Sequence, residues 1–181
     1  MRMTIEQFTE PVEYLPGSPK HAEGILAVQQ EGWLTAYVNP DLGITADLIN
    51  TRFANREERL AKLRERATEI TAGVVDKRLW VAVSGGEVIG YCSPLKLTET
   101  SGRLGALTVT PAFQGKGVAA HLIQLAIDWF GPMPMDLEVV AYNQRAIAFY
   151  KKFGFVETGS ASLEIGDKLM PLIKMRRVEL G

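Results

Sequence analysis

The spacing of apolar residues along the chain changes from helix-like to strand-like near residue 79. Before that point, the segment AEGILAVQQEGWLTAYV places Ile25, Val28 and Trp33 at helical spacing, which predicts a helix running into an aromatic loop that ends in NPDLGIT. Residues 55–71 are rich in acid–base pairs four positions apart and predict a solvated surface helix. The earlier stretch FTEPVEYLPGSPKH contains three prolines and predicts an irregular or edge segment.

The second half of the chain alternates strand-like runs with two helical segments. RLWVAV and VIGYCSPLKL flank a Gly-Gly turn and predict a β-hairpin, and RLGALTVT predicts a further strand that Pro111 ends. MPMDLEVVAY predicts a strand and NQRAIAFYKKF a short helix closed by Gly154. FVETGSASLEI and KLMPLIKMRRVEL predict two last strands. Two initial helices and this mixture of strands and helices predict an α/β sandwich built on a mixed sheet rather than a doubly wound fold.

Residues 116–130 form the most regular helical pattern of the sequence. One stripe of the predicted helix carries Val118, Leu122, Leu125, Ala126 and Trp129. The other side carries Gly117, His121, Gln124 and Asp128. The helix is therefore expected to cover one face of the sheet with its apolar stripe.

Composition and charge narrow the classes of function. The chain has 181 residues, 46% hydrophobic and 23% charged, and a net charge of −1, which fits one globular domain over residues 1–181 and argues against bulk binding of nucleic acid or anionic lipid. The chain has one cysteine and two histidines. A single cysteine excludes an internal disulfide, and the sequence contains no zinc-binding cluster, so no metal is expected. Cys92 lies in an apolar run and is interpreted as a core residue. Neither a signal peptide nor a membrane span is evident, so a cytoplasmic protein is expected.

Chemistry is indicated most clearly by the loop VTPAFQGKGVAAHL, which joins a predicted strand to the helix of residues 116–130. The first amides of a helix lack partners within it and, with the helix dipole, attract anions. Gly115 and Gly117 allow a phosphate to approach the main chain, Ala119 is small, and Lys116 adds a mobile positive charge. The loop alone leaves two interpretations open, a phosphate site or a tight turn whose glycines only relieve strain.

The surrounding motifs favour the first interpretation. LTVTPAFQGKGVAAHLI, followed some two dozen residues later by LEVVAYNQRAIAFYKKFGF, resembles the GNAT superfamily of N-acetyltransferases. The first segment resembles its V-x-P-x-x-[Q/R]-x-x-G-x-[G/A] motif and the second its N-x-x-A-x-x-x-Y-x-x-x-G-F motif, and the resemblance covers about residues 79–157. It implies a sheet of about six to seven mostly antiparallel strands, flanked by helices on both faces and splayed between the fourth and fifth strands, here residues 103–110 and 134–141.

The resemblance also implies acetyl-coenzyme A as the acetyl donor and assigns its contacts. The main chain of Leu107, Thr108 and Val109 would pair with the pantetheine arm like an added strand. Asn143 would touch the arm near its thiol end. The pyrophosphate would be held by the backbone amides of Gln114, Gly115, Lys116, Gly117, Val118, Ala119 and Ala120.

For catalysis, the resemblance assigns Tyr150 as the acid that protonates the departing thiolate, although a core aromatic residue would fit the same position. Many relatives carry a glutamate on the fourth strand, but RLGALTV contains no acid. Glu138 on the fifth strand matches the base proposed in relatives that acetylate protein N-termini, and a charged residue at the sheet surface is the alternative. Tyr37, Glu31, or no dedicated base also stay open.

The acceptor is the least determined part of the prediction. Trp33 and Tyr37 are candidates for lining its site, with a core position favoured for Trp33, and His121 is expected to be exposed. The leading hypothesis is acetyl transfer to a primary amine of a small molecule through a ternary complex. A protein or peptide N-terminus is the second, and a non-catalytic acyl-CoA-binding domain the third. A homodimer is expected by analogy only.

Overall fold

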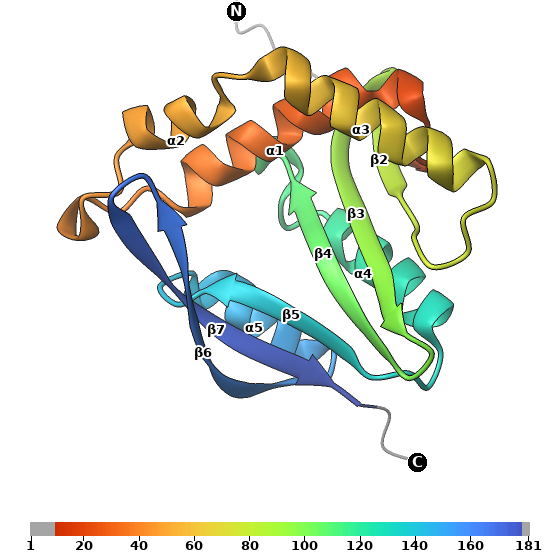
Figure 1. Ribbon diagram of the computed structural model, residues 1–181. Coiled ribbons are helices and arrows are strands. Elements are labelled where there is room, and N and C mark those ends of the chain that lie inside the picture. Colours follow the sequence, from red (N-terminus) through yellow and green to blue (C-terminus); the bar gives the residue numbers. More distant parts are fainter. Residues whose placement is uncertain (1–9, 179–181) are drawn as a thin grey trace, which may run out of the picture.

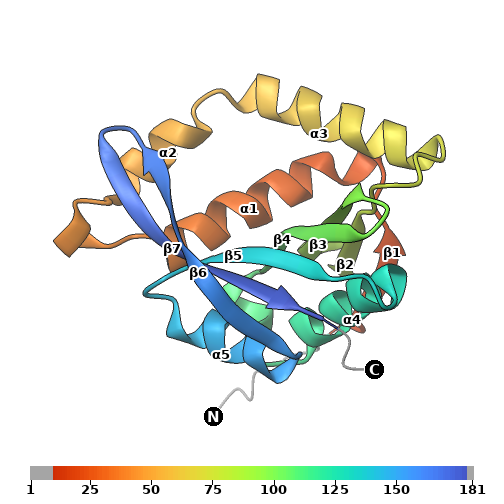
Figure 2. The same ribbon diagram turned by 60° about the horizontal axis from the view of Figure 1, so that its bottom comes forward.

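The computed structural model describes residues 10–178, which form a seven-stranded sheet with helices on both faces (Figures 1 and 2). In chain order the elements are β1 (Glu13–Pro16), α1 (Ala22–Ala36), α2 (Ala46–Phe53), α3 (Arg56–Thr71), β2 (Trp80–Ser84), β3 (Glu87–Thr98), β4 (Ser101–Val109), α4 (Val118–Phe130), β5 (Met135–Val140), α5 (Gln144–Lys152), β6 (Phe155–Ile165) and β7 (Lys168–Arg177). The first nine residues and the last three lie outside the described part of the chain.

The sheet is mixed and mostly antiparallel, as predicted. Its strand order is β1-β2-β3-β4-β5-β7-β6, and β4–β5 is its parallel pair. The helices α1, α2 and α3 lie on one side of the sheet, and α4 and α5 on the other (Figure 2). The predicted Gly-Gly hairpin joins β2 to β3, and positive φ angles of 57° at Gly85 and 82° at Gly86 explain why both turn positions are glycine.

One short helix was not predicted from the sequence, whereas the segment with three prolines forms the edge element that was one of its two predicted alternatives. The helix α2 begins after Thr45, whose hydroxyl caps the helix by accepting a hydrogen bond from the Leu48 amide, and it buries Ile49 and Phe53. With two buried positions in eight residues, α2 is too short to show a helical period. The segment with three prolines contains β1, an edge strand on β2, where proline at the strand end costs no ladder bond.

The helix α4 differs from its prediction in the face that it buries. The buried residues are Val118, Leu122, Ile123, Ala126, Ile127 and Phe130, whereas Leu125 and Trp129 are only half-buried. This helix is apolar around most of its circumference, so spacing alone could not fix the centre of the buried stripe. Trp129 instead lies at the border, where the cations of Arg78 and Lys96 approach its ring at 5.2 and 4.8 Å.

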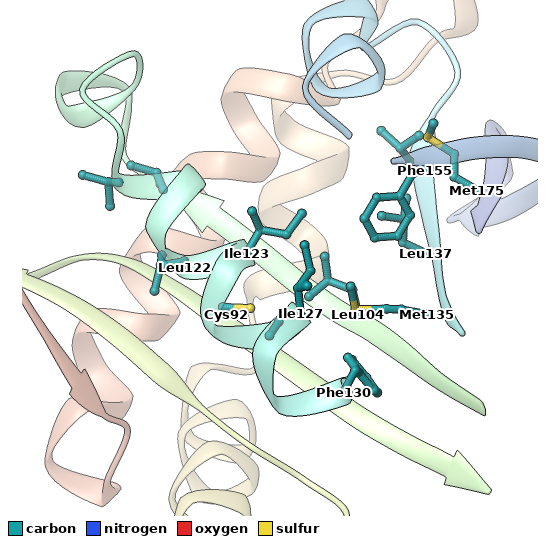
Figure 3. Packing of buried hydrophobic residues seen from close by; sticks show 14 of the residues in the cluster. Cys92, Leu104, Leu122, Ile123, Ile127, Phe130, Met135, Leu137, Phe155 and Met175 are labelled. Atoms are coloured by element: carbon teal, nitrogen blue, oxygen red, sulfur yellow. The ribbon is translucent and has the colours of Figure 1, made fainter. Parts of the chain in front are cut away.

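The largest buried cluster joins the two parts of the sheet through α4. Figure 3 shows Ile123 and Ile127 of α4 near Leu104 of β4 and Met135 of β5. Phe155 and Met175 extend the same cluster beneath β5 and β7. Cys92 is fully buried in it, which confirms its interpretation as a core residue, and burial raises the pKa of its thiol.

Candidate active site

The strands β4 and β5 are paired only where they begin. Their ladder consists of Gly102 with Met135 and Arg103 with Asp136, after which the strands diverge (Figure 1). The other edge of β5 pairs with β7 along all of its residues, 135–140. We call this divergence the splay. It leaves residues 104–109 of β4 without ladder partners on one side, which confirms the predicted splayed sheet and leaves a strand edge free for an added extended chain.

The glycine loop lies at the open end of the splay, between the end of β4 and the start of α4. The amides of residues 115–120 donate no hydrogen bond to any acceptor within residues 10–178, whereas the next amide, of His121, donates to the Gly117 carbonyl. Six consecutive free amides at a helix start form a concentrated anion site. The residues therefore fit a pyrophosphate, which is the ligand expected for the amides of Gly115, Lys116, Gly117, Val118, Ala119 and Ala120. The prediction for the Gln114 amide is wrong, because that amide already donates to the Pro111 carbonyl at 3.2 Å and is not free for a ligand.

The two glycines of this loop are required by its backbone and leave space in front of it. Gly115 has a φ of 77° and Gly117 a φ of 85°, in the left-handed region that favours glycine. A Cβ atom placed on either residue would meet no atom within 4 Å. The space beside the free amides is thus open, so the glycines both relieve strain and expose the main chain, whereas phosphate binding stays a prediction.

A side-chain bridge closes the loop against α5. The side-chain nitrogen Nε2 of Gln114 donates to the Val109 carbonyl at 3.1 Å, and its side-chain oxygen Oε1 accepts from the Arg145 guanidinium at 2.6 Å. The Lys116 ammonium is exposed and lies 4.9 Å from the centre of the Phe113 ring. Arg145 and Lys116 therefore place two cations near the free amides. Sequence reasoning missed Arg145, although its position in the second motif, two residues after Asn143, could have indicated it.

Asn143 and Tyr142 link the end of β5 to the elements around it. The Asn143 side chain caps α5 by accepting a hydrogen bond from the Ala146 amide at 3.1 Å. The Tyr142 hydroxyl donates to the Tyr37 carbonyl at the end of α1, at 2.6 Å. This bond ties the loop after α1 to the start of α5 across the sheet. The predicted contact of Asn143 with a pantetheine arm stays a prediction.

Tyr150 lies on α5 and is half-buried against the apolar cluster. Its ring makes edge contacts with Phe149 and Phe155, at centroid distances of 5.4 and 5.7 Å. Burial raises the pKa of the Tyr150 phenol well above its ordinary value, and the nearby Tyr37 and Cys92 side chains raise it further. The phenol is therefore held in its neutral, proton-carrying form. It also packs against the core, so the acidic and structural roles do not exclude each other.

Glu138 faces the side of the sheet that α1–α3 cover, because its neighbours Leu137 and Val139 point into the opposite cluster with α4. Its carboxylate accepts a hydrogen bond from Arg103 of β4 at 2.7 Å, and 29% of its side chain is exposed. This ion pair spans the narrow end of the splay. Sequence reasoning missed Arg103, because only the short parallel ladder brings it opposite Glu138. The role of Glu138 as a base stays a prediction.

The two aromatic candidates of the acceptor loop pack against each other but differ in their surroundings. Trp33 is half-buried, packs edge-on against Phe53 and Tyr37, and carries the Arg52 guanidinium 4.7 Å from its ring centre, which is a structural position. Burial raises the pKa of Tyr37, and the neighbouring Tyr142 raises it further. Tyr37 also raises the pKa of the Tyr150 phenol. A role of Trp33 or Tyr37 in lining the acceptor site stays a prediction.

The remaining candidates either offer main chain to the splay or lie apart from it. Thr108 of β4 lies against Gly32 of α1, and the Leu107 and Val109 side chains join the cluster with α4, so these three residues offer main chain rather than side chains to the splay. His121 is exposed and stacks on Tyr14 at 3.7 Å. Within residues 10–178, no group of three or more His, Cys, Asp or Glu side chains is arranged to hold a metal ion, and no helix is long and apolar enough to cross a membrane.

Comparisons with known proteins agree with this geometry. Rat N-acetyltransferase family 8 member 2 is 33% identical over 101 residues, covering 51% of this chain and 45% of that protein. N-alpha-acetyltransferase RimI of Mycobacterium tuberculosis is 32% identical over 81 residues, covering 43% of this chain and 51% of that protein. Peptidyl-lysine N-acetyltransferase YjaB of Salmonella typhimurium is 31% identical over 98 residues, covering 54% and 63%. The chain thus matches about half the length of these relatives.

Solved structures share the fold over nearly the whole chain. PaiA N-acetyltransferase from Thermoplasma acidophilum, in complex with coenzyme A, superposes with a TM-score of 0.75 at 18% identity, covering 93% of this chain and 99% of that one. Apo YjaB from Escherichia coli has a TM-score of 0.64 at 22% identity, covering 94% and 99%. The sequence profile of the Acetyltransferase (GNAT) family matches residues 45–155. With the splayed sheet and the two motifs in place, this match establishes that the chain belongs to the GNAT family of acetyltransferases.

Proposed function

We propose that the protein transfers the acetyl group of acetyl-CoA to a primary amine of a small molecule, directly and within a ternary complex. The observation that supports this most strongly is the run of six free amides, 115–120, at the open end of a strand edge that has lost its partner. When bound, acetyl-CoA supplies the acetyl group as a thioester. The amides would bind the pyrophosphate, and the main chain of residues 107–109 would pair with the extended arm.

Two side chains would handle the protons of the reaction. A bond from the amine nitrogen to the acetyl carbon forms as the carbon–sulfur bond breaks, so the amine loses a proton and the leaving sulfur gains one. Tyr150 would donate the proton to the sulfur, and burial keeps its phenol protonated for this step. Glu138 would accept the amine proton directly or through a water molecule. Its bond to Arg103 keeps the carboxylate oriented across the splay.

An acceptor on a protein is the second candidate function, because RimI and YjaB are an N-alpha-acetyltransferase and a peptidyl-lysine acetyltransferase. The deciding experiment mixes the protein with acetyl-CoA and a panel of small amines, peptides with free N-termini and lysine-containing peptides, and monitors release of free thiol. Turnover of small amines at higher kcat/KM than either peptide class supports the proposal. Faster turnover of peptides would replace it with the second candidate. Binding of acetyl-CoA without any acceptor-dependent thiol release would favour a non-catalytic acyl-CoA-binding domain.

A further inference from the structure

Side chains link the two parts of the sheet at the open end of the splay. The backbone ladder between β4 and β5 ends at Arg103 and Asp136, close to the start of both strands (Figure 1). At the far end of β4, the Val109 carbonyl accepts a hydrogen bond from Gln114, which in turn accepts one from the Arg145 guanidinium of α5. We call these two hydrogen bonds the side-chain bridge. It connects the end of β4 to the helix that follows β5, where the two strands are no longer paired.

Gln114, the middle residue of the side-chain bridge, is held by both its main chain and its side chain. Its amide donates to the Pro111 carbonyl, at the end of the short 3-10 helix Pro111–Phe113. Its Nε2 and Oε1 atoms each have a partner within the protein, Val109 and Arg145 respectively. The family motif has glutamine or arginine at this place, and the side chains of both can donate to a strand carbonyl. The structure thus indicates a bracing role for the Gln114 side chain.

Arg145 is drawn to Gln114 without competition from an acid. Its side chain is exposed, and its guanidinium donates to the Gln114 Oε1 at 2.6 Å. The ion pairs formed within residues 10–178 do not include Arg145. A hydrogen bond from a charged donor is stronger than one between two neutral groups. The glutamine oxygen is therefore the group that fixes the position of this guanidinium.

The helix α5 relates the side-chain bridge to the proposed chemistry. Arg145 lies in the first turn of α5, beside the capping residue Asn143, and Tyr150 lies little more than one turn further along. Tyr150 and Val109 also belong to one apolar cluster. The side-chain bridge therefore fixes the glycine loop, which would hold the acetyl donor, relative to the helix that carries the proposed acid.

We propose that Arg145 is a positioning residue. Through Gln114 it keeps the glycine loop in a fixed place relative to α5, so that the sulfur of bound acetyl-CoA lies within reach of the Tyr150 hydroxyl. This inference rests on the proposed function and adds to it a residue that aligns the donor with the acid. Alignment matters because a displacement of about 1 Å between reacting groups can cost roughly a hundredfold in rate.

The first test separates alignment from binding. Arg145→Met keeps a long side chain but removes the donor, and it should lower kcat about fivefold or more, the equivalent of at least one net hydrogen bond. The Kd for acetyl-CoA should stay nearly unchanged, because the free amides 115–120 do not depend on the side-chain bridge. A direct contact between Arg145 and a phosphate predicts the opposite, with weaker binding and an unchanged kcat. Kinetics under conditions where chemistry limits the rate, together with calorimetric titration, measure both quantities.

The second test exchanges the two side chains of the bridge. In Gln114→Arg alone, two guanidinium groups face each other, and kcat should fall as it does in Arg145→Met. In the double variant Gln114→Arg and Arg145→Gln, the arginine at position 114 can donate both to the Val109 carbonyl and to the new glutamine oxygen. The double variant should therefore recover nearly the wild-type kcat, with an unchanged net charge.

A matched control and a measurement without ligand complete the design. Gln124 donates a comparable exposed side-chain hydrogen bond, to Asp128 on α4 at 2.7 Å, so Gln124→Ala should leave both kcat and the Kd for acetyl-CoA unchanged. In the ligand-free protein, the free energy of unfolding is measured in urea for Gln114→Ala, Arg145→Met and their combination. The combined loss should be smaller than the sum of the single losses, because both variants remove the same hydrogen bond.

Three results would overturn the role of Arg145: a wild-type kcat in Arg145→Met, weakened acetyl-CoA binding without a loss of kcat, or no recovery of kcat in a folded double variant. Strictly additive losses of stability would show that the hydrogen bond between Gln114 and Arg145 does not form in solution, and would overturn it as well. In all these cases the remaining turnover leaves the acetyltransferase proposal standing. Only the absence of thiol release with every acceptor would remove both.

Discussion

The backbone character of the proposed pyrophosphate site can be tested at Gly117. Valine there should weaken acetyl-CoA binding more than Lys116→Ala does, because a branched side chain would fill the open space beside the free amides. Losing two hydrogen bonds from amides to a charged phosphate costs about 3 kcal/mol, or roughly a hundredfold in affinity. Lys116 is exposed, so its charge contributes at most about 1 kcal/mol.

Valine at Gly117 also strains the backbone, since φ is 85° there, at a cost of about 1–2 kcal/mol of folding free energy. Gly86 is the matched control, because it has a φ of 82° and equally open space but lies in the β2–β3 hairpin. Gly86→Val should destabilise the fold to a similar degree and leave acetyl-CoA affinity unchanged. Calorimetric titration and thermal unfolding of the three variants measure both effects.

Two results would refute this reasoning. If Lys116→Ala weakened binding more than Gly117→Val, side chains rather than amides would hold the phosphates. If Gly86→Val weakened binding as much as Gly117→Val, the loss would come from general destabilisation of the fold and would say nothing about the loop.

Four further outcomes are expected. Tyr150→Phe should lower kcat by about tenfold or more with unchanged acetyl-CoA affinity, and a wild-type rate where chemistry is limiting would exclude Tyr150 as the acid. Glu138→Gln should lower kcat/KM by a factor that shrinks at high pH, where the amine deprotonates unaided; a loss independent of pH would argue against a base. Tyr142→Phe should raise the acceptor KM a few-fold through loosening of the Tyr37 loop, at a cost of about 1 kcal/mol, with acetyl-CoA affinity as the unaffected control. Stability to urea should fall above about pH 9, because the Cys92 and Tyr150 groups ionise in the unfolded chain while their raised pKa values keep them neutral in the fold; Cys92→Ala should reduce this loss.

Most of the fold could be predicted because its elements have local signals. The β2–β3 hairpin follows from two adjacent glycines, and Pro111 ends the strand that precedes the glycine loop. By contrast, α2 buries only Ile49 and Phe53, and the stripe of α4 depends on how the helix rests on the sheet. Such features are decided by tertiary contacts, which no local pattern records.

The candidate site likewise has features that the sequence indicates and features that depend on contacts between distant segments. The free amides of the glycine loop follow from a glycine-rich helix start, so a sequence could indicate them. The partners of its side chains could not be predicted, because they join distant segments: Arg103 meets Glu138 through a ladder of two residue pairs, and the Tyr142 hydroxyl reaches the Tyr37 carbonyl across 105 positions.

The short ladder between β4 and β5 has a mechanical consequence. Because only two residue pairs join them, the two parts of the sheet are held at their angle mainly by packing against α4, in which Ile123 lies in one buried cluster with Leu104 of β4 and Met135 of β5. Side-chain volume, rather than backbone bonding, therefore sets how far the strands stand apart. Because protein interiors are close-packed, removing or adding even one methylene group in this cluster would change the distance between the diverging strands β4 and β5. Residues that never touch a ligand thus govern the width available to it.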